Sequence, residues 1–128
     1  MTKRVHLDTD FLIYAVSVRG PERRRLQELV ESDSVIEMSA VAWYEFCRGP
    51  RSPEQIAVAR SLFDEEGIIA LNENLAERAA EEFKRLGRPR KRAADLAIGV
   101  TARECKATLV TRNKHDFAGI DGLTVDSD

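Results

Sequence analysis

Residues 5–13, with the sequence VHLDTDFLI, decide the fold of this chain. A short strand-like run ends at Asp8, and a second apolar run follows within a few residues. The first run has the length of a buried strand, and the second has the apolar character of a helix that begins near Asp10. We therefore expect Asp8 at the carboxyl end of a central strand, which is the edge where open α/β sheets bind their ligands.

The rest of the sequence alternates strand-like and helix-like segments. Further short strands are predicted at residues 35–38, 68–71, 108–110 and 123–125. Helices are predicted at residues 22–31, from Ser52 to Phe63, and over residues 75–86 with Asn72 as the N-cap and Gly87 as the stop. Such alternation implies parallel strands joined by right-handed crossovers. The predicted fold class is therefore α/β, with three layers, in which a twisted parallel sheet of about five short strands is covered by helices.

Two other helical segments, residues 40–47 and 93–100, are apolar nearly all round, and such helices are usually buried. The chain has 128 residues, 43% of them hydrophobic, which is enough for one core and too few for two ordinary domains. We expect a single domain over residues 1–128. No run approaches the roughly 18 apolar residues of a membrane span, so a cytoplasmic protein without membrane contact is expected.

The two cysteines, Cys47 and Cys105, lie far apart in the sequence and lack any paired spacing. Their surroundings are apolar and helix-like. We expect reduced core thiols rather than a disulfide or a zinc site.

Four acidic residues interrupt apolar sequence at or near predicted strand ends. They are Asp8, Glu45, Asp95 and Asp116. Each has a simpler explanation when it is taken alone. Asp8 could cap the first helix, and Glu45 could pair with Arg48. Asp95 could pair with Arg92, or could be an acid in the first turn of a helix that the helix dipole stabilises. Asp116 could end a surface turn. Taken together, acids in separate apolar segments indicate one shared site.

Carboxylates that converge in a low dielectric repel one another, so their pKa values rise unless a cation neutralises them. An oxygen-only set of donors, without a His or Cys pair, selects Mg²⁺ or Mn²⁺ over zinc. Such ions also bind phosphate oxygens, and the arrangement is typical of phosphodiester hydrolysis. The pattern is compatible with one ion or with two.

The order and spacing of four sequence blocks resemble the PIN-domain family, and within it the VapC-type toxin ribonucleases of toxin–antitoxin pairs. The blocks are residues 5–13 (VHLDTDFLI), 38–49 (MSAVAWYEFCRG), 94–99 (ADLAIG) and 107–117 (ATLVTRNKHDF). The resemblance implies a PIN-like fold, metal-dependent endoribonuclease activity on RNA, a cognate antitoxin of a type II toxin–antitoxin system, and a homodimer.

The resemblance also implies roles for individual residues. Its catalytic acids would be Asp8, Glu45, Asp95 and Asp116, of which Asp8, Asp95 and Asp116 would bind the Mg²⁺ or Mn²⁺ ion. Thr111 and Asn113 would be their neighbours.

One position departs from the family pattern. After Asp8 and Thr9 the family usually has Asn, whereas this chain has Asp10. Asp10 could add charge to the site, change a hydrogen bond beside it, or cap the first helix.

Residues 84–92 hold six cations and no acid. A solvated basic loop is the simpler interpretation, but next to an acidic site such a patch would suit a polyanion. The candidate RNA contacts are Arg85, Arg88, Arg90, Lys91 and Arg92. Secondary candidates for phosphate contacts are Arg48, Arg51, Arg112 and Lys114.

Two rival functions remain open. The Asp8–Asp10 pair also resembles the haloacid-dehalogenase phosphatases, with Ser39 as their second motif, although Glu45 and Asp95 would then have no role. The chain could instead be a PIN module that binds RNA or a partner without catalysis. Metal-dependent stabilisation would distinguish a carboxylate site from a pure binding module.

Overall fold

The computed structural model describes residues 3–127, and at its centre lies a five-stranded sheet in the order β3-β2-β1-β4-β5. All neighbouring strands are parallel. The strands are β1 (Arg4–Leu7), β2 (Val35–Ser39), β3 (Ile68–Ile69), β4 (Thr108–Thr111) and β5 (Thr124–Ser127). The first strand of the sequence is therefore the central strand of the sheet, as expected.

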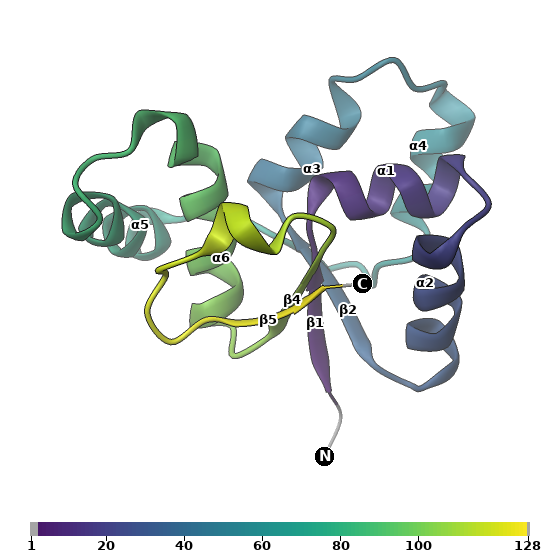
Figure 1. The fold of residues 1–128 in the computed structure, drawn as a ribbon. Helices are drawn as coiled ribbons and strands as arrows, with labels where there is room; N and C mark the ends of the chain where they lie inside the picture. The colour runs from purple at the N-terminus through teal and green to yellow at the C-terminus, as the bar shows by residue number, and fades with distance from the viewer. Residues whose placement is uncertain (1–2, 128) are drawn as a thin grey trace.

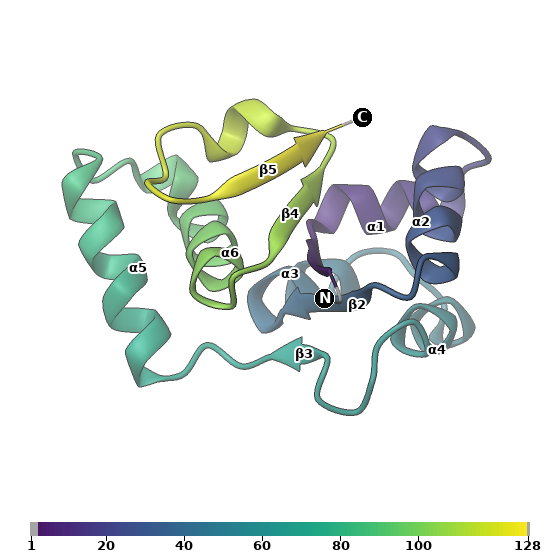
Figure 2. The ribbon, with the colours of Figure 1, turned by 90° about the horizontal axis from the view of Figure 1, so that it is seen from below.

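Helices cover both faces of this sheet, which confirms the predicted three-layer α/β fold (Figures 1 and 2). On one side lie α1 (Thr9–Ser17), α2 (Pro21–Glu31) and α4 (Pro53–Arg60), and on the other lie α5 (Glu73–Arg85) and α6 (Ala93–Glu104). The remaining helical segments are α3 (Ala40–Cys47) and the 3₁₀ turns η1 (Arg90–Arg92) and η2 (Lys114–Phe117).

The order of the strands creates a crevice at the end of β1. The chain first runs from β1 to β2 and β3 on one side, and then returns to β4 and β5 on the other side. In the register, His6 of β1 lies opposite Glu37 of β2 and Leu109 of β4. From the neighbouring strands β1 and β4 the chain continues in opposite directions along the sheet, to β2 and to β5, and a ligand site of open α/β sheets forms at the carboxyl ends of two such strands. Asp8 follows β1 at this point.

The helix caps agree with the sequence predictions. Asn72 caps α5 by accepting a hydrogen bond from the backbone N–H of Leu75, at 2.9 Å. Ser52 caps α4 and forms a reciprocal capping box with Gln55. The predicted helix after Ser52 is shorter than expected, because it ends at Arg60.

The two apolar helices differ in burial. Half of the twelve residues of α6 are buried, all of them between Leu96 and Ala102, so this helix is a core helix as predicted. The prediction is wrong for α3, where only Ala42 and Phe46 are buried and Tyr44 is 61% exposed. The reason is position, because the described layers of the fold bury only the side of α3 that carries Ala42 and Phe46. The guanidinium of Arg48 lies over the Tyr44 ring, 5.2 Å from its centroid, and covers part of this exposed surface.

Both cysteines are free, and each is half-buried rather than a fully buried core thiol. The prediction that they form no disulfide is confirmed. Among residues 3–127, every helix is too short or too polar to span a lipid bilayer.

Candidate active site

An open cavity of about 460 Å³ lies at the carboxyl ends of the central strands. All four predicted acids line it, although they come from four different segments of the chain. Its lining residues with acidic side chains are Asp8, Asp10, Glu45, Asp95 and Asp116. Asn113 also borders the cavity, whereas Thr111 lies behind it.

Asp8 is fixed by hydrogen bonds to both carboxylate oxygens. Its Oδ1 accepts from the backbone N–H of Thr9 at 2.8 Å, so Asp8 caps α1. Its Oδ2 accepts from the hydroxyl of Thr111 at 2.7 Å, and that hydroxyl in turn accepts from the backbone N–H of Asn113 at 2.9 Å. Asp8 and Thr111 are both buried. The capping explanation for Asp8 is therefore correct, but it does not remove Asp8 from the cavity.

Glu45 reaches the cavity from α3. The hydroxyl of Thr9 donates to Oε1 of Glu45 at 2.8 Å, while Arg48 lies 3.7 Å from Oε2. The Arg48 ion pair suggested by the sequence therefore exists, but it is long and exposed. Thr9 was missed by the sequence analysis, because nothing in the local pattern showed that α1 and α3 meet there.

Asp95 and Asp116 approach from the far side of the crevice. Asp95 lies in the first turn of α6, and Asp116 lies in the exposed turn η2. Arg92 donates to the carbonyl oxygen of Asp116 at 3.2 Å and also to that of Ala118. It therefore holds the backbone of the segment that carries Asp116.

Asp10 occupies the position where the family usually has Asn. It is exposed on the cavity wall and accepts a hydrogen bond from the side-chain amide of Asn113, at 3.0 Å. The capping explanation for Asp10 is wrong, because Asp8 caps the helix. Asp10 adds negative charge beside Asp8. Its hydrogen bond with Asn113 also links α1 to the segment that follows β4.

The electrostatics of the cavity show an excess of negative charge. The pKa of Asp8 is raised to about 6, mainly by burial and in smaller part by nearby Asp10 and Glu45, even though its hydrogen bonds to Thr111 and Thr9 lower it. Burial also raises the pKa of Asp95 to about 6, with contributions from Asp8, Asp116 and Glu45. Carboxylates of this kind are stabilised in their charged form by a cation.

Arg51 introduces a cation into the same cavity. Its guanidinium lies over the Phe46 ring, 4.8 Å from the centroid. Its Nε and Nη1 are buried and have no hydrogen-bond partner among the described residues. Gly49 leaves the space for this position, because a Cβ there would lie 1.8 Å from Nη1 of Arg51. The side chain thus places a positive charge at the wall of an acidic cavity.

The predicted basic patch is divided. Arg85 forms an ion pair with Glu82 at 2.8 Å, and Arg92 is occupied with the backbone near Asp116. Arg88, Arg90 and Lys91 are exposed. None of the five candidate RNA contacts lines the described cavity. Among the secondary candidates Arg48 and Arg51 do line it, whereas Arg112 pairs with Glu22 and packs on Tyr14.

A parallel α/β fold with a crevice of carboxylates at its switch point defines a class of protein suited to binding a divalent cation. A model of the PIN domain family matches residues 5–123, so the chain belongs to the PIN domain family. None of the curated proteins compared with the sequence matches it significantly.

Several solved structures resemble this one over nearly their whole length. A chain of the VapBC2 complex from Rickettsia felis, bound to a promoter DNA fragment, has a TM-score of 0.75 at 20% identity, and the match covers 98% of each chain. A chain of a toxin–antitoxin complex from Klebsiella pneumoniae has a TM-score of 0.70 at 29% identity and covers 94% of this chain and 95% of its own. A chain of VapBC-1 from nontypeable Haemophilus influenzae has a TM-score of 0.70 at 24% identity, with 97% of each chain covered.

Proposed function

We propose that this PIN domain is a metal-dependent endoribonuclease and the toxin component of a type II toxin–antitoxin system. The observation that carries the proposal is that Asp8, Glu45, Asp95 and Asp116 come from four segments and line one cavity. Membership of the PIN domain family, whose members are typically nucleases, supports the same conclusion.

The donors fit a hard divalent ion. Asp8, Asp95 and Asp116 would hold Mg²⁺ or Mn²⁺ through carboxylate oxygens, with Glu45 completing the acidic set. Such an ion, when bound, supplies an activated water and offsets the charge that develops on an attacked phosphate. The raised pKa values of Asp8 and Asp95 are consistent with a site whose charge is balanced by a cation.

The chain's own residues would position the substrate. Thr9 and Thr111 hold Glu45 and Asp8 in fixed orientations through their hydroxyl groups. Arg51 would attract a phosphate group of RNA to the cavity wall through its positive charge. The same contact would extend along the backbone of a longer RNA to Arg88, Arg90 and Lys91. Neutralising two of these three side chains should then reduce the salt dependence of RNA binding.

The proposed partners follow from the similar structures. Chains that resemble this one occur in toxin–antitoxin complexes, which supports a cognate antitoxin. We also propose that the protein forms a homodimer.

The test is cleavage of a mixed, end-labelled RNA pool by the purified protein in Mg²⁺, in Mn²⁺ and in EDTA. We expect internal cleavage that EDTA abolishes and that Asp8→Asn reduces by at least about a hundredfold. The matched control is Asp64→Asn, which changes an exposed aspartate outside the cavity and should leave cleavage unchanged.

The same preparations distinguish the rival functions. Hydrolysis of a phosphomonoester without RNA cleavage would favour the phosphatase interpretation of Asp8 and Asp10. Against that rival, Ser39 caps α3 by accepting from the N–H of Ala42 and does not line the cavity. Tight RNA binding without cleavage in either metal would favour the binding module.

A further inference from the structure

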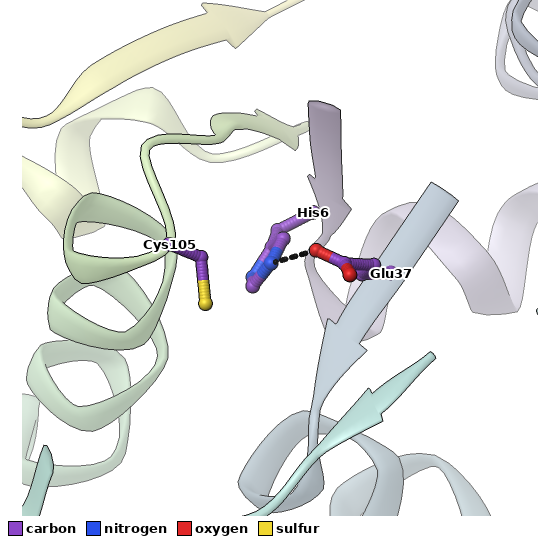
Figure 3. A group of neighbouring side chains, drawn as sticks. All are labelled: His6, Glu37 and Cys105. Atoms are coloured by element: carbon purple, nitrogen blue, oxygen red, sulfur yellow. Dashed lines mark hydrogen bonds and ion pairs between the residues drawn. The ribbon is translucent and has the colours of Figure 1, made fainter. Parts of the chain in front are cut away.

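A second group of metal-ligating side chains lies outside the acidic cavity. It consists of His6 on β1, Glu37 on β2 and Cys105 at the C-terminal end of α6 (Figure 3). One ligand atom from each residue, a ring nitrogen, a carboxylate oxygen and the sulfur, lies within 4.8 Å of the other two. Figure 3 shows the imidazole ring between the carboxylate and the thiol.

The histidine at the centre of this group is buried and incompletely bonded. His6 is 1% exposed, and its Nε2 lies 3.0 Å from Oε1 of Glu37. Its Nδ1 has no hydrogen-bond partner within residues 3–127. A buried ring nitrogen without a partner costs free energy, so its presence in a folded protein calls for a ligand or another explanation.

We propose that His6, Glu37 and Cys105 bind one thiophilic divalent cation, of which Zn²⁺ fits best. A set of one nitrogen, one sulfur and one oxygen donor is typical of zinc, whereas Mg²⁺ prefers oxygen donors alone. Three protein ligands leave a fourth position for water. When the cation binds, the Cys105 thiol releases its proton to solvent and the thiolate becomes the ligand.

Arg4 is the competitor of the cation in this site. Its Nη2 lies 2.7 Å and its Nε 3.2 Å from the same oxygen of Glu37 that contacts His6, and the guanidinium also lies within reach of the Cys105 sulfur. The Arg4 side chain is 40% exposed, so it can turn into solvent when a cation takes its place. Removing the guanidinium should therefore strengthen metal binding.

The proposed site is chemically distinct from the acidic cavity. The cavity offers only oxygen donors from side chains, and Cys105 does not line it. The new site would link α6 to β1 and β2. Of these elements, α6 carries Asp95 and β1 ends directly before Asp8. Its occupation should therefore stabilise the fold without any need for nuclease activity.

Titration with Co²⁺ as a spectroscopic substitute for Zn²⁺ tests the proposal. Thiolate coordination to Co²⁺ gives a near-ultraviolet charge-transfer absorption, which a carboxylate-only site cannot give. We expect this absorption at one equivalent of Co²⁺, its loss on addition of Zn²⁺, and its loss in Cys105→Ser. Cys47→Ser is the matched control, because it removes the other half-buried thiol and should leave the absorption intact.

Further variants separate this site from the proposed nuclease site. Asp95→Asn should keep the absorption even though it disables the acidic cavity. His6→Leu should weaken Zn²⁺ binding by at least about tenfold, the scale on which even residues that only orient a metal ligand act. Arg4→Gln should tighten binding. Absence of the absorption in the reduced wild-type protein, or its persistence in Cys105→Ser, would overturn the proposal.

Discussion

Asp8 shows how one residue can serve the fold and the site together. One of its carboxylate oxygens caps α1, and the other accepts from the Thr111 hydroxyl. These contacts lower the cost of burying the charge, but burial and the neighbouring acids still raise its pKa to about 6. Within residues 3–127, Asp95 accepts no such hydrogen bond from a hydroxyl or amide group. Replacing Asp95 therefore tests charge repulsion more directly than replacing Asp8, whose hydrogen bonds would be disturbed as well.

Asp95→Asn should abolish RNA cleavage and leave the metal-free protein as stable or more stable. The neutral amide removes the repulsion from Asp8, Asp116 and Glu45. The free energy of unfolding should rise by only about 1 kcal/mol, because Asp95 is half-buried and solvent screens part of the repulsion. Urea unfolding in EDTA measures the change, with Asp64→Asn as the control. A loss of more than about 2 kcal/mol would indicate that Asp95 holds the fold through an ion pair.

Gly49→Ala should act through Arg51. The new Cβ would lie 1.8 Å from Nη1, so the guanidinium must leave its place over Phe46. Because a flexible side chain moves easily, we expect a change in unfolding free energy of less than about 1 kcal/mol and a weakening of RNA binding similar to that of Arg51→Gln. Filter binding of a catalytically inactive Asp8→Asn background measures the affinity. Unchanged affinity in both variants would exclude Arg51 from the RNA site.

At the level of elements, α6 connects the separate parts of the molecule. Its first turn carries Asp95 and it ends beside Cys105. At its middle, Gly99 allows the segment after η2 to approach closely. The position of Asp116 therefore depends on the packing of α6 as well as on Arg92.

Gly99→Ala tests this packing. A Cβ at position 99 would lie 2.6 Å from Cδ1 of Ile120 and 3.4 Å from Cδ1 of Phe117, so the buried Ile120 side chain must move, and we expect the segment around η2 to move with it. Overpacking of this kind costs about 1–3 kcal/mol, although alanine favours the helix, and the shift should lower RNA cleavage by moving Asp116. Thermal unfolding and the cleavage assay measure the two effects. Gly20→Ala is the control, since its Cβ would meet nothing nearer than 3.8 Å.

At the scale of the whole molecule, the chain has a net charge of only −2, but its acids are unevenly distributed. Five carboxylates line the cavity. Because the strands are parallel, their carboxyl ends lie at the same edge of the sheet, and the five carboxylates come together at this edge. The sheet and the helices hold them there. Stability and metal binding should therefore depend on pH in a linked way.

The metal-free protein should lose stability as the pH rises from about 4 to about 7. Asp8 and Asp95 have pKa values of about 6 in the folded protein and ordinary values near 3.8 when unfolded. Between these two pKa values the folded state binds more protons than the unfolded state. The contribution of the two carboxyl groups to stability is therefore fully present below about pH 4 and is lost as the pH rises through about 6. Urea unfolding in EDTA across this range measures the loss, which added Mg²⁺ should reverse at pH 7.5. A flat profile in wild-type protein, or no difference from the Asp8→Asn/Asp95→Asn double variant, would contradict this account.

The sequence by itself determined the class of fold and the candidate acids. Strand-like runs, helical spacing and the caps Ser52 and Asn72 are local properties, so each segment shows them without its neighbours. The acids were predictable as a group because the carboxyl ends of parallel strands meet at one edge.

Only the tertiary structure decided which side chains meet across segments. Arg92 appeared to belong to a basic patch, yet it holds the backbone at Asp116. Tyr44 lies in an apolar run but is exposed, because the described layers of the fold leave that side of α3 uncovered. His6 and Cys105 are 99 residues apart in the sequence, as their numbers show, and come together only because α6 packs on the face of β1 and β2. Contacts of this kind depend on the packing of layers, and no local pattern encodes it.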